Sequence, residues 1–202
     1  MGARLDQDLF HLLQIEEYRE ALRHVLVETY FDPATQERLL RQSAFNYQVA
    51  AYSSDLLERA RKQIREKPVE LKEDPVRDQG FRRAIVRAYN HRCSLCGVRI
   101  LTAEGHTAIA AAHIIPWRVS HDDDPRNGLA LCHLCHWTFD EGLVTVGNNY
   151  QIRMSPQLAH SENVPGHLAT IADRDLIGPS EESLWPFKES LQWHRQEVFR
   201  RR

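Results

Sequence analysis

Apolar residues at helical spacing run through the first third of the chain. Leucines and valines recur three or four positions apart between positions 5 and 26, and a second stretch of the same period follows from 39 to 64. Residues three and four apart share one face of an α-helix, so both stretches predict amphipathic helices. Asp32-Pro33 lies between them, and proline is favoured at a first helical position. We therefore expect residues 4–66 to form a helical hairpin or a dimer interface.

A polar stretch follows this helical pattern. Residues 68–78 contain two prolines and no apolar period, which is typical of a linker. The chain is therefore predicted to divide into a helical N-terminal region, a linker, a central domain and a C-terminal appendage, over residues 1–67, 68–78, 79–157 and 158–202.

The central domain mixes helical and strand patterns. An amphipathic helix is expected over residues 81–90, a strand over 107–115, a short helix from about His133 to Phe139 and a final hairpin over 144–152. Pro116 ends the expected strand, and Gly142 is suited to cap the short helix. An amphipathic helix is also expected near the C-terminus. The predicted fold class is α+β.

Composition bounds the setting of the protein. The chain has 202 residues, 42% of them hydrophobic, and a net charge of −2. The first residues lack the basic start and apolar core of a signal peptide, and no apolar run approaches the ~18–20 residues that a membrane span needs. We expect a cytoplasmic protein without membrane contact, in which cysteines stay reduced and available for a metal.

Local charge differs from the global balance. Five arginines lie between positions 77 and 92 against one acid, Asp78, and the chain ends in three arginines. A basic face of this kind suits a phosphate backbone, with Arg83 and Arg87 as candidate DNA-binding residues. The alternative is that these arginines only solvate a helix.

All four cysteines fall into two Cys-x-x-Cys pairs, formed by Cys93 with Cys96 and by Cys132 with Cys135. Two residues between thiolates let both sulfurs reach one ion, and two such pairs supply the four ligands of a structural zinc site. Two disulfides or four unrelated buried thiols are the alternatives. We expect structural Zn²⁺.

Three segments around these cysteines carry a more specific signal: AAHIIPW at 111–117, DPRNGLALC at 124–132 and CHWTFDEGL at 135–143. In this order they resemble the HNH endonuclease family, in the restriction-endonuclease-like branch whose finger is braced by a four-cysteine zinc. The resemblance implies a strand–strand–helix (ββα-metal) finger that hydrolyses phosphodiester bonds in DNA, in a restriction or phage-defence role.

The resemblance also implies roles for individual residues. His113 corresponds to the general base, Asn127 to the asparagine that ties the loop to the strand, and His136 to a ligand of the catalytic Mg²⁺ or Mn²⁺. Asp140 follows His136 by four residues, so both share one helix face and can hold one cation. Many family members have Asp or His immediately before the base, where this chain has Ala112.

The remaining expectations concern partners. Arg118 and Arg126, between the base and the asparagine, either contact phosphate or pair with Asp122, Asp123 and Asp124. Cutting both strands with a single-site finger calls for two copies, so we expect a homodimer. Targeting then comes from the helical segment or from a partner protein. A non-catalytic zinc-braced nucleic-acid-binding or protein-interaction module is the alternative function, which Ala112 favours.

Overall fold

The computed structural model describes residues 4–65, 74–159 and 162–201. The chain forms two compact units, Met1–Gln48 and Val49–Arg202, called here the N-terminal and C-terminal units. The described residues contain helices and two small antiparallel sheets, which confirms the α+β class. None of the described helices is both long and apolar enough to cross a membrane.

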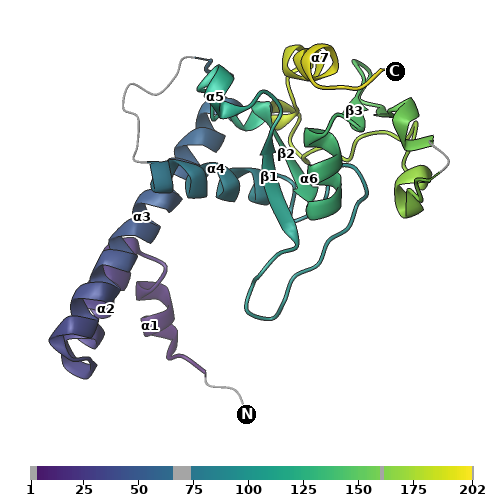
Figure 1. Cartoon of the computed structure of the whole chain (residues 1–202). Helices are drawn as coiled ribbons and strands as arrows, with labels where there is room; N and C mark the ends of the chain where they lie inside the picture. The colour runs from purple at the N-terminus through teal and green to yellow at the C-terminus, as the bar shows by residue number, and fades with distance from the viewer. Residues whose placement is uncertain (1–3, 66–73, 160–161, 202) are drawn as a thin grey trace. The chain divides into compact units, whose positions relative to one another are not determined.

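The N-terminal unit is helical, as predicted. It contains α1 (Gln7–Leu12), α2 (Glu16–Tyr30) and the first part of α3 (Pro33–Arg61), drawn in purple to blue in Figure 1. Asp32 begins α3 because its carboxylate accepts hydrogen bonds from the backbone N–H groups of Ala34 and Thr35, both at 3.1 Å. Proline at the first helical position is confirmed. α3 then continues without a break to Arg61.

The core of the C-terminal unit is built around two strands, β1 (Ile109–His113) and β2 (Gly128–Cys132). They pair antiparallel, with His113 opposite Gly128. In Figure 1 these strands lie between α4 (Asp74–Ala88) and α6 (His133–Asp140). A Cβ at position 128 would overlap side chains of α4, so glycine permits the close approach of helix and strand.

Residues 74–78, which we expected in the linker, form the first turns of α4. Pro75 is compatible with this position because the first turn of a helix needs no intrahelical N–H donor. The rest of the predicted linker lies outside the described residues. The other predicted domain bounds stay predictions.

Shorter elements complete the unit. The predicted hairpin is confirmed as β3 (Val144–Val146) and β4 (Ile152–Met154). The further elements are the helices α5 (Trp117–Ser120) and α7 (Lys188–Glu197) and the 3-10 turns Pro125–Asn127, Pro156–Ala159, Gly166–Thr170 and Glu182–Leu184. Gly142 follows α6 with a φ of +68°, so the glycine cap is also confirmed.

Candidate functional site

The four cysteine side chains meet at one point. Cys93 and Cys96 follow α4, Cys132 ends β2 and Cys135 lies in α6, and their sulfur atoms are all within 4.8 Å of one another. Ligands 2.3 Å from a shared ion in a tetrahedron lie about 3.8 Å apart, and the sulfurs of Cys96 and Cys132 are 3.7 Å apart. No disulfide joins the four cysteines. This donor set fits zinc and excludes the two-disulfide alternative in this structure.

Hydrogen bonds position the first cysteine pair. The Cys93 carbonyl accepts the N–H of Gly97 at 3.0 Å, and the N–H of Ser94 donates to Ala130 of β2 at 2.7 Å. Gly97 has a φ of +78°, as its turn requires. Hydrogen bonds from neighbouring thiols lower the pKa of Cys93, whereas burial raises the pKa of Cys96. If all four sulfurs were ionised at this spacing, a cation between them would be needed to offset their repulsion.

Beside the cysteine cluster lies an open groove with a volume of about 890 Å³, called here the catalytic groove. His113 from β1 lines it together with His136 and Asp140 from α6. Side chains alternate along a strand, so His113 and Ala111 face the groove. Ala112 is only 1% exposed. Alanine at this position offers no ligand atom to a cation.

One buried carboxylate orients His113. Nε2 of His113 lies 2.9 Å from Oδ1 of Asp123, and the imidazole stacks on Phe81 with ring centroids 3.7 Å apart. Arg77 donates to both Asp123 oxygens, at 3.0 and 3.2 Å, and the Tyr52 hydroxyl lies 3.1 Å from Oδ2. Burial is the main cause that raises the pKa of Tyr52, so the phenol stays a neutral donor. Asp123 is thus a fully bonded acceptor beneath the imidazole.

Sequence reasoning missed this network. It considers Asp123 as a possible partner of Arg118 or Arg126, but the Asp123 side chain is buried, with 7% of the residue exposed. Its partners Tyr52 and Arg77 lie 71 and 46 residues away along the chain, so no local motif marks them. Arg77 is among the arginines expected on a basic face. Its guanidinium instead lies under Trp117, 3.9 Å from the ring centroid.

Asn127 joins the end of β1 to the following loop. Its side chain accepts the N–H of Ile115 at 3.1 Å and donates to the carbonyls of Ile115 and Asp122, at 3.1 and 3.2 Å. The asparagine is 1% exposed and therefore holds the loop from inside. These bonds fix the backbone at both ends of the segment from Ile115 to Asp122.

His136 and Asp140 lie one turn apart on α6, with Nε2 and Oδ2 separated by 3.3 Å. Desolvation raises the pKa of the Asp140 carboxyl, and the charge of His136 acts in the opposite direction. The side chain of Asp140 is 59% exposed, so solvent screens this effect. Among the described residues, the cysteines form the only group of three or more potential metal ligands. A cation on α6 would thus find two protein ligands.

The candidate DNA-binding arginines separate into two groups. Arg126 is 4% exposed and forms a two-point ion pair with Asp124, at 2.9 and 2.7 Å, so it stabilises the loop and is not available to DNA. The pairing alternative is correct for this residue, because a buried guanidinium needs a counter-charge. Arg83 and Arg87 are exposed on α4, and exposed Arg118 lines the catalytic groove. These three stay candidates.

A buried histidine supports the wall of the groove. His194 from α7 is 2% exposed, its Nε2 donates to the Phe139 carbonyl at 3.0 Å, and its Nδ1 lies 2.8 Å from Oγ1 of Thr145. Its ring stacks on Phe139 with centroids 3.7 Å apart. Burial lowers the pKa of His194 to about 4. The neutral ring therefore ties α7 to α6 next to Asp140.

Comparisons with known proteins agree with this geometry. Residues 93–147 match the family described as HNH endonuclease. The match spans just over a quarter of the chain and includes the cysteine pairs, His113, Asn127 and His136. The resemblance to HNH endonucleases predicted from the sequence is confirmed over these residues. The predicted enzyme class is confirmed at that level.

Among solved structures, a modification-dependent TagI restriction endonuclease is similar at 22% sequence identity and a TM-score of 0.45. The similar region covers 62% of this chain and 40% of that chain, so this protein spans less than half the length of that enzyme. No curated protein matches the chain.

Proposed function

We propose that this protein is a metal-dependent endonuclease that hydrolyses phosphodiester bonds in DNA, in a restriction or phage-defence role. The observation that carries the proposal is the catalytic groove, which brings a carboxylate-bonded imidazole and a histidine–aspartate pair to one surface beside a cysteine cluster. The family match supports the nuclease class.

His113 acts as general base. An ionised Asp123 can only accept hydrogen bonds, so Nε2 of His113 carries the hydrogen and Nδ1 keeps its lone pair. That lone pair takes a proton from water as the water attacks phosphorus. Arg77 pairs with Asp123 as well as with the exposed Asp78, and the first of these ion pairs stabilises the buried carboxylate that orients the ring. Phe81 prevents the ring from tilting.

His136 and Asp140 would hold Mg²⁺ or Mn²⁺, which when bound neutralises charge on the phosphate and on the leaving oxygen. Nitrogen and carboxylate donors one helical turn apart suit such a cation. Zn²⁺ in the cysteine cluster would have a structural role, since its ligands fix β2 and α6 to the turn after α4. Asn127 keeps His113 at the rim of the groove by holding the loop that follows β1.

We also propose that the N-terminal unit forms a homodimer. Val27 is the single buried side chain among the described residues of this unit. Its exposed large apolar residues are Leu5, Phe10, Leu12, Ile15, Tyr18, Val25, Leu26, Tyr30, Phe31 and Tyr47. Exposed apolar surface of this extent favours association. Two copies would supply one catalytic groove for each DNA strand.

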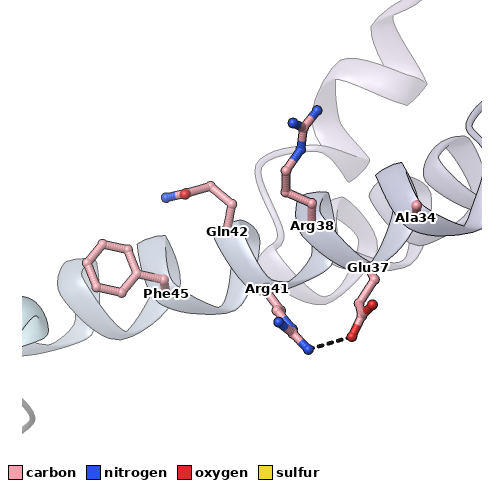
Figure 2. A pocket seen from close by; sticks show the side chains of 6 residues that line it. All are labelled: Ala34, Glu37, Arg38, Arg41, Gln42 and Phe45. Carbon is pink, nitrogen blue, oxygen red and sulfur yellow. Dashed lines mark hydrogen bonds and ion pairs between the residues drawn. The ribbon is translucent and has the colours of Figure 1, made fainter.

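The N-terminal unit also carries a polar hollow on α3. A hollow of about 380 Å³ lies along one side of α3. Figure 2 shows the side chains that line it, among them the Glu37–Arg41 ion pair and the Phe45 ring. A mixture of charge and aromatic surface suits a specific interface. Light scattering on the purified protein should give twice the chain mass, and a monomer at micromolar concentration would contradict the dimer. In that case we would instead expect a targeting partner protein to bind the exposed apolar surface of the N-terminal unit.

The nuclease function is tested by incubating plasmid with the protein and Mg²⁺ or Mn²⁺. We expect nicked or linear product that chelator abolishes, and a fall of about 10²–10⁴-fold in rate for His113→Ala. His106→Ala, at an exposed loop position, is the matched control and should cleave at the parent rate. Full activity of His113→Ala would remove His113 from the mechanism.

A zinc-braced binding module without catalysis is the second candidate. The observation that favours it is the absence, among the described residues, of a third protein ligand beside His136 and Asp140. Tight DNA binding with no cleavage of modified or unmodified DNA, with either cation, would support this module and reject the nuclease.

A further inference from the structure

Three arginine side chains from separate segments converge on a second cavity of the C-terminal unit. Arg153 comes from β4, Arg195 from α7 and Arg201 from the C-terminal tail, and they line a volume of about 440 Å³. Apolar walls complete this three-arginine pocket, formed by Met154, Pro156 and Phe199. Neither the general base nor the histidine–aspartate pair contributes to it.

The charges of the three arginines are not balanced within the described part of the chain. Among the described residues, no Asp or Glu lines the pocket. Arg195 donates to the Val146 carbonyl and to Asn148, and Arg201 donates to the carbonyl of Arg195. These neutral partners fix two guanidinium groups in place without neutralising them. Burial lowers the pKa of Arg195, and the charges of Arg153 and Arg201 act in the same direction. An anion in the pocket would relieve this repulsion.

The C-terminal tail connects the three-arginine pocket to the catalytic groove. Val198 and Arg200 line the groove, whereas the alternate residues Phe199 and Arg201 line the three-arginine pocket. The tail itself is held in place, since the N–H of Arg200 donates to the Gly142 carbonyl at 3.0 Å. The Arg200 carbonyl accepts a hydrogen bond from Ser155 Oγ at 2.6 Å. The catalytic groove and the three-arginine pocket therefore lie on opposite sides of one tail segment, residues 198–201, whose backbone is held by hydrogen bonds.

We propose that the three-arginine pocket binds a phosphodiester group of the same DNA, at a position other than the bond that is cut. This inference rests on the proposed DNA nuclease function. Each guanidinium group presents paired N–H donors that match the oxygens of a phosphate. Three guanidinium groups around one cavity therefore suit an anion with two acceptor oxygens, such as a phosphodiester. Such a contact fixes the register of the backbone without reading sequence. The three-arginine pocket thus holds the DNA backbone on one side of the tail, while His113 acts on the scissile phosphate in the catalytic groove on the other side.

The test is DNA binding by Arg153→Gln/Arg201→Gln, measured in a His113→Ala background so that no cleavage is required. Arg195 is left unchanged because it supports the hairpin. Fluorescence anisotropy with a short duplex at several salt concentrations gives Kd and the slope of log Kd against log salt. Loss of one phosphate contact should weaken binding about tenfold and reduce the slope by about one. Lys62→Gln removes one charge from an exposed pair with Glu58 and is the control; it should leave the slope unchanged.

Three further measurements separate the outcomes. Zinc content and melting temperature establish that the double variant is folded; a folded variant with the parent Kd and slope overturns the pocket while leaving the nuclease proposal intact. If the parent itself binds no duplex, the proposed function and this inference fail together. Duplexes with and without 5′-phosphates distinguish the phosphate source, because a loss confined to phosphorylated ends would assign the pocket to a terminal phosphate and reject the internal diester.

Discussion

Nε2 of His113 lies 2.9 Å from Oδ1 of Asp123, and this contact joins the proposed base to two helices. Tyr52 of α3 and Arg77 of α4 both donate to the same carboxylate. A buried carboxylate is costly unless donors satisfy it, so the two helices stabilise the orientation of the imidazole. Tyr52 and Arg77 both precede residue 79, the predicted start of the nuclease domain. A domain with that boundary would therefore lack two of the partners of Asp123.

Asp123→Asn should lower the cleavage rate by about 10²-fold or more while zinc content and DNA affinity change little. The amide can donate as well as accept, so it no longer restricts His113 to the Nε2–H form. ¹⁵N NMR of the imidazole should show one tautomer in the parent protein and a mixture or the opposite tautomer in the variant. An unchanged tautomer together with a parent-like rate would show that Asp123 has no positioning role.

Tyr52→Phe removes one donor to Asp123 and leaves Arg77 in place. A hydrogen bond to a charged group contributes about 1.5–3 kcal/mol, so urea unfolding should show a loss in that range. The cleavage rate should fall less than in Asp123→Asn, because the carboxylate stays. A larger rate loss in Tyr52→Phe than in Asp123→Asn would contradict this order.

Cys135→Ser should abolish zinc binding and leave the C-terminal unit without stable tertiary structure. Structural zinc contributes an apparent ~10–16 kcal/mol in finger peptides, more than a typical domain of this size can lose. Metal analysis and circular dichroism in the near ultraviolet check the result. Ser94→Ala is a matched control, since this buried hydroxyl has no hydrogen-bond partner among the described residues. A folded, zinc-free and active Cys135→Ser protein would reject the metal brace.

Acidification should destabilise the protein through His194. Burial lowers the pKa of this histidine to about 4, below the reference value of 6.5, so the folded state favours the neutral ring. Its stabilising contribution is present above pH 6.5 and is lost as the pH falls towards 4. Between pH 7 and pH 5 the loss should be about 2 kcal/mol.

The measurement is urea unfolding of parent and His194→Phe proteins at both pH values. Phenylalanine keeps the stacking on Phe139 but cannot take up a proton. The pH-dependent difference between the two proteins isolates His194 from other titrating groups. An identical pH dependence in both would contradict the assignment.

Sequence alone determined the features that depend on local spacing. Two Cys-x-x-Cys pairs defined the candidate zinc ligands, and their convergence within 4.8 Å agrees with that prediction. The four-residue separation of His136 and Asp140 placed both on one helix face, as found on α6. Proline at the start of α3 and glycine after α6 were also predictable, because each reflects the backbone preference of a single residue.

Tertiary structure decided every feature that depends on residues far apart in the chain. Asp123 and Arg126 lie three positions apart in one polar loop, yet one orients His113 and the other stabilises the loop. Nothing in their local sequence distinguishes them. The three-arginine pocket likewise combines a strand, a helix and the tail. Periodicity and spacing describe one element at a time, whereas burial and charge pairing depend on which elements fold against one another.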